Sequence, residues 1–538
     1  MPKDYNTALG HPRPQLLDRL ASHPGASIVV IDGGSVTRFD GSRIHDDTLA
    51  VLRYLQGQGV HAGCRVGIRA ANCYEWLILD FALITLGCTS VCIPVGNPEL
   101  DPLSAEALVA RFDLNLLFQD TNFETGVCEA VTELPALLKL TETGASPVLT
   151  GTAPQAADDV FTIVFSSGTT GRLKRLPISW DSLQIGIEAV SDTFEIDGTD
   201  RIFDILPLSI FQQRYLAYCA LYRGATVILS TQDQFFEALT AGNPTVILGP
   251  PAFYEVAEQR FDRWSPRRRR VLSKVSDLVP PPFRKAVRKR LFKPLHEIYG
   301  TSVRAMLVGS APINQSTLKF FERAGFPLYQ IYGMTECGWI AWNRPGENKI
   351  GSVGKPAFPG AISLGPDGEV LVRNPKHLCR YYEGAEAAEI ATVFVDDRTI
   401  STGDIGRFDE DGFLFLGGRK KNVIITAGGQ KISPEHVEDK VKALGGMDHV
   451  VVFLDEGLRA LSAVIWATET DAEAQRRIAR DIRALNRRHL STTPIMGLVF
   501  SDVPLTPETG LLTRNLKVDR AAVEARLAAQ VDHIGAWK

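Results

Sequence analysis

The sequence predicts an α/β fold: a large amino-terminal domain of stacked α/β sheets that ends in a small β-barrel-like element, then a small α+β domain. Two observations predict it. Short apolar strands alternate with stretches of helical period through the first 400 residues, which is typical of largely parallel sheets. From about residue 350 to 416 glycine and proline become dense, and after Gly417 a strand-and-helix pattern restarts. We therefore place the two domains at 1–416 and 417–538.

The elements of the large domain follow from short apolar runs. The expected strands are Ser27–Ile31, Arg65–Ile68, Asn115–Phe118, Phe161–Phe165, Arg201–Leu206, Ala225–Leu229, Thr245–Leu248 and Arg304–Val308. Helical period covers Thr48–Gln56 and Asp181–Thr193. Further on, Glu369–Arg373 and, after the turn signal Asp411-Gly412, Phe413–Leu416 are expected to be antiparallel strands of a small β-rich element.

The most apolar stretch, Trp76–Val95, has two interpretations. A membrane helix needs about 20 nearly uninterrupted apolar residues. This stretch carries Asp80 in its middle and Pro94 near its end. We therefore favour a buried helix that ends at Gly87, followed by a short strand at Ser90–Ile93.

The small domain begins with a strand at Asn422–Thr426 and a Gly428-Gly429 turn. A helix is expected to open at Ser433-Pro434-Glu435, because serine is a good N-cap and proline fits the first helical position. By contrast, Gly57–Gly63 follows a helix and not a strand, so we interpret these glycines as a helix cap and not as a dinucleotide site.

Composition excludes several classes of function. The chain has 538 residues, 45% of them apolar and 22% charged, with 58 Lys plus Arg and 62 Asp plus Glu. A net charge of −4 gives no field that would collect nucleic acid. Its eight cysteines form no Cys-x-x-Cys pair, which favours a reduced compartment and argues against structural zinc. The first residues lack a basic segment followed by an apolar core, so we expect a cytoplasmic protein without a secretory signal or transmembrane segment.

One stretch is strongly basic. Nine arginines and lysines crowd into Arg267–Arg270 and Arg284–Arg290. The stretch could bind the phosphates of a nucleotide tail, a carrier protein or an anionic surface, or it could be a solvated helical face. Composition does not choose between these alternatives.

The strongest chemical signal is the loop after Phe165, which reads Ser-Ser-Gly-Thr-Thr-Gly-Arg-Leu-Lys174. Glycines bring backbone N–H groups close to an anion, hydroxyls donate to phosphate oxygens, and the lysine supplies a positive charge. It is not a Walker loop, because Gly168 and Gly171 stand three apart and Lys174 three further on. We interpret it as a phosphate-binding loop.

Four weaker patterns follow along the chain. Ile331-Tyr-Gly-Met-Thr-Glu336 puts an aromatic ring, a hydroxyl and a carboxylate after a strand at Pro327–Ile331. Ser401-Thr-Gly-Asp404 puts an aspartate at a strand end, where it would accept hydrogen bonds from two ribose hydroxyls or form an Asx turn. The others are Gly418-Arg-Lys-Lys421 and the segment Thr506–Arg520.

Together these motifs resemble the adenylate-forming (AMP-binding) superfamily, which contains acyl-CoA synthetases, non-ribosomal adenylation domains and beetle luciferases. The resemblance covers essentially the whole chain, and Gly510-Leu-Leu-Thr-Arg-Asn-Leu-Lys517 is most similar to the long-chain acyl-CoA synthetase, or fatty-acid–CoA ligase, branch. It implies a large adenylation domain and a small mobile lid that carries Lys517.

The resemblance also implies roles for individual residues. It assigns ATP and AMP binding to Ser166, Ser167, Gly168, Thr169, Thr170, Gly171, Lys174, Ser310, Ala311, Pro312, Tyr332, Gly333, Thr335, Asp404 and Arg419. Lys517, Thr335 and Glu336 would be catalytic, and Glu336 would bind magnesium. Lys421 would be the hinge of the small domain. The acyl pocket would involve Ile210, Phe211, Gly333 and Trp339.

The implied reaction is the activation of a carboxylic acid by ATP. Attack of the carboxylate on the α-phosphate gives acyl-AMP and pyrophosphate, and Lys517 and magnesium offset the repulsion between the two anions. A thiol then takes the acyl group. Coenzyme A is the leading acceptor, and the phosphopantetheine arm of an acyl carrier protein is the alternative.

Departures from the family pattern leave the acid open. Arg175 stands where glycine is usual, and Ile210-Phe211-Gln212-Gln213-Arg214 replaces the residues that follow Leu206-Pro-Leu-Ser209 in many relatives. Trp339 could shorten the acyl tunnel and select a short or medium acid, or it could pack sideways into the core. Adenylation of an unusual acid in a natural-product pathway, or delivery of the adenylate to an amine, also fits.

Two other classes of protein share this fold. A regulatory protein that lost turnover is disfavoured, because Lys174, Thr335, Glu336, Asp404, Arg419 and Lys517 are all present. Nothing in the sequence points to a luciferase-like oxygenase.

Overall fold

The fold is taken from a computed structural model, which describes the greater part of the chain. The described residues are 22–23, 25–97, 99–123, 131–143, 160–167, 173–204, 206–231, 234–262, 287–288, 290–373, 377–425, 431–455, 457–458, 460–490, 493–506, 508–512 and 518–537. Most of the basic stretch Arg267–Arg290 therefore lies outside them.

A nine-stranded sheet forms the centre of the large part of the molecule. Its strands run in the order β15 (Lys355–Pro356), β14 (Gly338–Trp342), β13 (Leu328–Met334), β12 (Ala305–Val308), β11 (Val246–Gly249), β9 (Arg201–Asp204), β10 (Thr226–Leu229), β1 (Ser27–Asp32) and β2 (Ser35–Asp40). The six strands from β13 to β1 are parallel, and the outer strands are antiparallel. The expected α/β architecture is thus confirmed, with strand ends shifted by one or two residues.

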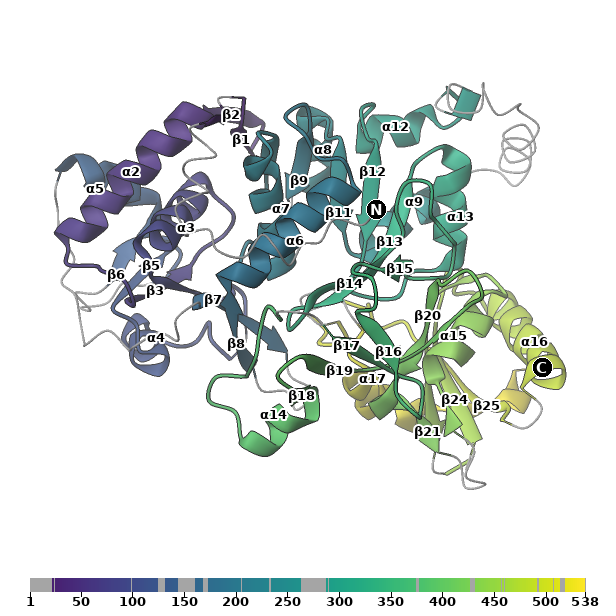
Figure 1. Ribbon diagram of the computed structural model, residues 1–538. Helices are drawn as coiled ribbons and strands as arrows, with labels where there is room; N and C mark the ends of the chain where they lie inside the picture. The colour runs from purple at the N-terminus through teal and green to yellow at the C-terminus, as the bar shows by residue number, and fades with distance from the viewer. Residues whose placement is uncertain are drawn as a thin grey trace.

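Helices cover both faces of this sheet (Figure 1). One face packs on α6 (Trp180–Thr193) and α7 (Phe211–Tyr222), and the other on α8 (Phe235–Gly242), α9 (Pro251–Asp262), α12 (Lys293–Tyr299) and α13 (Gln315–Ala324). Side chains alternate between the two cores along each strand: in β9, Ile202 belongs to the α7 side and Phe203 to the opposite side.

A six-stranded sheet lies beside it and shares the core on the α7 side. Its order is β6 (Val131–Glu133), β5 (Leu116–Gln119), β3 (Arg65–Arg69), β4 (Thr89–Cys92), β7 (Val160–Ser167) and β8 (Leu173–Ser179). The helices packed here are α2 (Gly41–Gly57), α3 (Tyr74–Leu86), α4 (Ala105–Phe112) and α5 (Leu137–Thr143).

Helix α3 confirms the interpretation of the most apolar stretch. Ten of its thirteen residues are buried, it ends at Gly87 in the left-handed conformation (φ 74°), and Asp80 is fully buried in its middle. None of the helices in the described part of the chain combines the length and the apolarity that crossing a membrane requires.

A five-stranded antiparallel sheet follows, as the sequence predicted for this region. It contains β16 (Ile362–Leu364), β17 (Glu369–Arg373), β18 (Phe394–Asp396), β19 (Thr399–Phe408) and β20 (Leu414–Arg419), with α14 (Ala387–Val393) beside it. The predicted domain boundary between 416 and 417 falls inside β20, because β20 pairs with β19 as far as Arg419.

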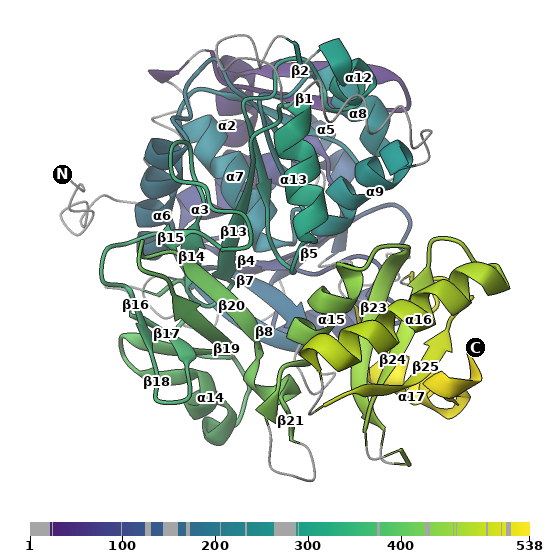
Figure 2. The same ribbon diagram turned by 90° about the vertical axis from the view of Figure 1, so that its right-hand side faces the viewer.

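The last part of the chain has hydrophobic clusters of its own, built from residues 424 to 537. It contains β21 (Ile424–Ile425), β22 (Lys431–Ile432), α15 (Pro434–Lys442), β23 (Met447–Asp455), β24 (Ala460–Ala467), α16 (Ala472–His489), β25 (Ile495–Phe500), α17 (Arg520–Leu527) and β26 (Asp532–His533). The expected helix start is confirmed, since Ser433 Oγ accepts a hydrogen bond from the N–H of His436 at 3.4 Å. Figure 2 shows this part gathered at one end of the larger part.

Candidate active site

The carboxyl ends of the parallel strands β9, β11, β12 and β13 meet at one edge of the nine-stranded sheet, and the predicted site residues cluster there. Ser310, directly beyond β12 and Gly309, is exposed and has φ 71°. A serine in this left-handed region is strained, and such strain is concentrated at functional sites. Ala311 and Pro312 continue the same turn, so the predicted adenine-facing segment does lie at this edge.

Tyr332, Asp404 and Arg419 form one connected group. The Tyr332 hydroxyl donates to Asp404 Oδ2 at 2.6 Å, and Arg419 Nε donates to Asp404 Oδ1 at 2.8 Å. Burial and the nearby Asp404 carboxylate raise the pKa of Tyr332 well above its ordinary value, so the phenol keeps its proton.

Two positions in this group differ from expectation. Asp404 was expected at a strand end, but it lies inside β19, because Gly403 takes φ 70° without ending the pairing with β17 and β20. Tyr332 was expected after its strand, but β13 extends through it to Met334. Both side chains are therefore held by a sheet ladder and not by a loop.

A steric constraint explains why residue 333 is a glycine. The register of β13 and β14 shifts between Tyr332 and Gly333, and a Cβ on Gly333 would lie 2.5 Å from the carbonyl oxygen of Gly338. The turn that follows carries Thr335 and Glu336, and any larger residue at 333 would push it away.

Glu336 is buried, and one of its carboxylate oxygens is already oriented. The Tyr382 hydroxyl donates to Glu336 Oε1 at 2.7 Å, and the backbone N–H of Cys379 donates to the Glu336 carbonyl at 2.8 Å. The described residues hold no cluster of three or more metal-ligating side chains. Magnesium does not require one, because it is commonly bound through one or two carboxylates together with substrate phosphates, and Glu336 fits that arrangement.

Thr335 has a neighbour to which the sequence assigned no role. Gln212, in the first turn of α7, donates from Nε2 to Thr335 Oγ1 at 3.2 Å. Because the hydroxyl oxygen already accepts this bond, its own proton is left to donate to another oxygen. Tyr382 was also missed, since it stands 46 residues from Glu336 and no pattern links the two.

The segments on either side of the predicted phosphate loop, β7 and β8, pair antiparallel. The expected strand end at Phe165 is wrong: β7 continues through Ser166 and Ser167, because Ser166 pairs with Lys174 and Ser167 with Leu173 in the antiparallel strand β8. Gly168, Thr169, Thr170 and Gly171 lie outside the described residues.

Lys174 belongs to a group of cations. Its Nζ lies 2.7 Å from Glu389 Oε1 and 4.3 Å from the ring centroid of Tyr382. Lys421 follows β20 in a short 3-10 turn, and its pKa is lowered by burial and by the charges of Arg419 and Lys174. The positive charges of Lys174 and Arg419 thus act on Lys421, although Lys174 and Arg419 each have a carboxylate partner, Glu389 and Asp404. Lys517 and Gly428-Gly429 lie outside the described residues.

Comparison with known proteins shows the family of the chain. A model of the AMP-binding enzyme family matches residues 17–382, more than half of the chain. The chain belongs to the AMP-binding enzyme family. The resemblance, the fold class and the enzymatic nature expected from the sequence are thereby confirmed.

Individual relatives of this AMP-binding enzyme are CoA ligases by name. The long-chain-fatty-acid–CoA ligase FadD15 of Mycobacterium bovis is 29% identical over 541 residues, covering 88% of each chain. The anthranilate CoA ligase AuaEII, solved with anthranoyl-AMP, superposes with a TM-score of 0.75 at 18% identity, covering 97% of this chain and 99% of that one. The o-succinylbenzoate CoA synthetase of Bacillus subtilis, solved with its acyl-adenylate intermediate, gives 0.70 at 20% identity, covering 95% and 97%.

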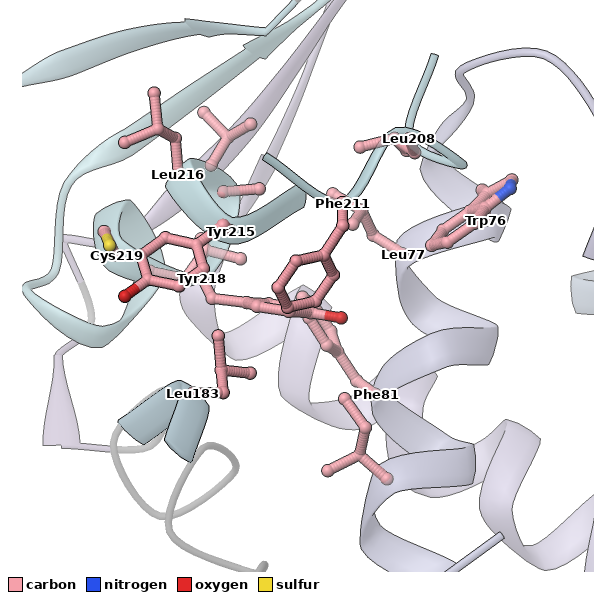
Figure 3. Packing of buried hydrophobic residues seen from close by; sticks show 14 of the residues in the cluster. Trp76, Leu77, Phe81, Leu183, Leu208, Phe211, Tyr215, Leu216, Tyr218 and Cys219 are labelled. Atoms are coloured by element: carbon pink, nitrogen blue, oxygen red, sulfur yellow. The ribbon is translucent and has the colours of Figure 1, made fainter. Parts of the chain in front are cut away.

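The start of helix α7 and the strands β13 and β14 carry the residues that the sequence assigned to the acyl pocket of this AMP-binding enzyme. Ile210 is the N-cap of α7, and Phe211 is buried among aromatic side chains (Figure 3). Trp339 is buried in β14 and meets Tyr215 edge to face, with ring centroids 5.6 Å apart. Its place in the core is therefore established by its packing, whereas its role as a wall of the pocket stays a prediction.

A buried ion pair anchors the same helix. Arg214 and Asp80 are both fully buried, and Arg214 Nη1 lies 3.3 Å from Asp80 Oδ1. Arg214 also donates to Thr162 Oγ1 in β7 at 3.0 Å, and Tyr218 donates to Asp80 Oδ2. Burial alone would lower the pKa of Arg214, but Cys92, Tyr218 and Asp80 raise it above its ordinary value, so the arginine stays charged.

Proposed function

We propose that this enzyme activates a carboxylic acid with ATP and magnesium as an acyl-adenylate, releases pyrophosphate, and transfers the acyl group to the thiol of coenzyme A. Two groups of contacts support the proposal. Asp404 is bonded to both Tyr332 and Arg419, and Tyr382 connects Glu336 to Lys174 through its hydroxyl and its ring. That set offers an aromatic ring, hydrogen-bonding groups for a ribose, a carboxylate for magnesium and positive charge for phosphates.

The nucleotide would be held by groups that are already fixed. Tyr332 would lie along adenine, with Ser310–Pro312 on its other side. Asp404 and Arg419 would hold the ribose hydroxyls, and the hairpin with Ser166, Ser167 and Lys174 would enclose the β- and γ-phosphates. Lys174 must then exchange its partner Glu389 for phosphate.

The first half-reaction joins two anions. A carboxylate oxygen of the acid attacks the α-phosphorus, the bond from that phosphorus to the bridging oxygen breaks, and pyrophosphate leaves. Magnesium, when bound at Glu336, neutralises phosphate charge. The Thr335 hydroxyl donates a hydrogen bond to a phosphate oxygen, and Lys517 bridges the carboxylate and the α-phosphate.

The second half-reaction breaks the mixed anhydride. The thiolate of coenzyme A attacks the acyl carbon, the carbon–oxygen bond to phosphate breaks, and AMP leaves. In this proposal the small domain, 417–538, rotates about Lys421 between the two steps and withdraws Lys517. The names of the relatives favour coenzyme A as acceptor; a carrier-protein arm remains the alternative.

The test is exchange of labelled pyrophosphate into ATP, with magnesium and a panel of acids of graded length and shape, without coenzyme A. We expect exchange with one narrow group of acids. Glu336→Gln should abolish it, whereas Glu297→Gln, on an exposed face of α12, should not change it. Adding coenzyme A or a carrier protein with its arm then identifies the acceptor. Exchange that survives Glu336→Gln would refute the assigned metal role.

A further inference from the structure

Asp204 is a buried carboxyl group with no partner. The side chain is the last of β9 and is 1% exposed, and neither oxygen has a hydrogen-bond partner among the described residues. Buried polar groups are almost always paired, so an unpaired carboxyl in a folded core calls for an explanation.

Every other buried aspartate in the described part of the chain has partners. Asp47 pairs with Arg43 and Tyr74, Asp80 with Arg214 and Tyr218, Asp200 with Arg304 and Thr245, and Asp404 with Tyr332 and Arg419. Asp200 stands just before the same strand, at 2% exposure, and accepts from Arg304 Nη2 at 2.6 Å. Each of these four aspartates is therefore paired with an arginine, whereas Asp204 has no cation beside it among the described residues.

The loop after Asp204 is held without it. Asn72 Nδ2 donates to the carbonyls of Leu206 at 3.0 Å and Ser230 at 3.1 Å, and the N–H of Leu208 donates to Asn72 Oδ1 at 2.8 Å. Asp204 thus contributes no side-chain hydrogen bond to the turn it precedes. A structural role for its carboxyl group is not visible.

Position in the sheet places Asp204 on the side of the predicted acyl pocket. Side chains alternate along β9, so Asp204 shares a face with Ile202, whose core also contains Phe211 and Trp339. It pairs in register with Leu229 of β10, another member of that core. It also lies at the carboxyl edge of the sheet, where Ser310 and Tyr332 begin the nucleotide site.

We propose that Asp204 recognises a hydrogen-bond donor, a hydroxyl or amino group, on the tail of the acid that this enzyme activates. The preferred substrates are then carboxylic acids that carry such a group, and not plain hydrocarbon acids. The inference rests on the proposed acid-activating function and names its substrate class. Burial disfavours the charged form and raises the pKa of Asp204 to about 8. Such a shift is consistent with a carboxyl group whose hydrogen-bond partner is supplied by the substrate.

The test uses pyrophosphate exchange with matched sets of acids: unsubstituted, hydroxylated and aminated at the same carbon of the same chain. We expect wild-type kcat/KM to favour a donor-bearing acid at least tenfold over its unsubstituted match. Asp204→Leu should reduce that preference to less than threefold without lowering exchange with the unsubstituted acid. Asp204→Asn keeps an acceptor oxygen, so it should retain preference for a hydroxyl and lose preference for an amino group.

Stability provides a readout that needs no substrate. Because Asp204 has no partner, Asp204→Leu should raise the melting temperature, whereas the control Asp200→Asn should lower it. Equal loss of exchange with all acids in Asp204→Leu, or an unchanged preference, would overturn the inference while leaving the proposed function intact. Absence of exchange with every acid in the wild type would overturn both.

Discussion

The hydroxyl of Thr335 can both accept and donate, and its neighbour determines which bond is left for the substrate. Gln212 Nε2 donates to Thr335 Oγ1 at 3.2 Å, so the hydroxyl proton points elsewhere. We expect Gln212→Leu to lower kcat for pyrophosphate exchange about tenfold, with less change in KM for ATP, because a positioning group is lost and not a direct contact.

Gln212→Glu sharpens this test. A carboxylate would accept the Thr335 proton instead of donating to the oxygen, so the loss should exceed that of Gln212→Leu. A glutamate variant as active as wild type would show that the bond does not orient the hydroxyl.

Asp404 is a second residue whose proposed role can be tested by substitution. It is held by both Tyr332 and Arg419, and we assign it the ribose. Asp404→Ala should weaken ATP binding at least tenfold, about 1.4 kcal/mol, in equilibrium binding measurements. Tyr332→Phe removes one hydrogen bond to Asp404 and keeps the ring, so it should cost less. Unchanged affinity in Asp404→Ala would make the ribose assignment wrong.

Asp204 predicts a pH dependence of stability. Burial raises its pKa to about 8 in the folded protein, above the ordinary value of 3.8, so the folded state retains a proton that the unfolded state loses. The stability linked to this proton is fully present below pH 4 and is lost as pH rises toward 8. Asp204→Asn removes the linkage, so its advantage over wild type should grow by about 3 kcal/mol between pH 5 and pH 8. Unfolding curves that shift in parallel at both pH values would contradict this.

Sequence reasoning found the residues that stand in motifs. Tyr332, Asp404 and Arg419 were chosen from three separate segments, and the structure joins them by hydrogen bonds. The sequence alone did not reveal Tyr382 or the role of Gln212, because both act through contacts between distant segments of the chain. It could not single out Asp204 either, since the missing partner is a property of the packed core.

At the scale of elements, the first turn of α7 connects several parts of the molecule. Gln212 contacts Thr335 beyond β13, Gln213 Oε1 accepts from the N–H of Leu206, and Arg214 contacts Thr162 of β7. Strand β7 leads directly to Ser166 and Ser167. The helix thus links the β7–β8 hairpin to the strand ends at which we propose that the nucleotide binds.

Removing Arg214 tests that link. Arg214→Met leaves the buried carboxylate of Asp80 without its cation, and breaking a buried ion pair costs about 3–5 kcal/mol. The double variant Arg214→Met with Asp80→Leu should recover much of the loss, because no buried charge remains. Urea unfolding measures both. The matched control is Arg344→Met, whose ion pair with Glu347 is exposed and worth about 1 kcal/mol or less. A cost for Arg214→Met as small as for this control would contradict the assigned role.

The elements themselves were largely predictable because their signals are local. The end of α3 at Gly87 and the start of α15 at Ser433 agree with their capping residues. Strand ends were less predictable: β7 continues past Phe165 because β8 pairs with it, and β19 continues past Gly403 between two neighbours. Pairing partners, and not local composition, determine where those strands stop.

In the reaction that we propose, two parts of the molecule with separate hydrophobic clusters act together. The cations Arg419 and Lys421 stand where the chain passes from β20 into the last part, beside Lys174 of the large part. A rotation of the small domain about this point would change which of its side chains face the nucleotide. We expect Lys517 to face the nucleotide in the first half-reaction and to move away from it before the second.

Lys517→Ala separates the two half-reactions. The lysine offsets charge only while carboxylate and α-phosphate react, so adenylate formation should fall by about 100-fold or more. Thiolysis of supplied acyl-AMP by coenzyme A should stay within a few-fold of wild type. Quenched assays of each half-reaction measure the two rates separately. An equal loss of rate in both would refute the role of Lys517.

The fate of the α-phosphate of ATP distinguishes activation of the acid through an adenylate from every other route to acyl-CoA. ATP labelled in that phosphate is mixed with enzyme, magnesium and the acid that supports exchange, first without coenzyme A and then with it. We expect label in enzyme-bound acyl-AMP first, and labelled AMP together with acyl-CoA after coenzyme A is added. Labelled ADP, or acyl-CoA formed without any labelled AMP, would contradict it.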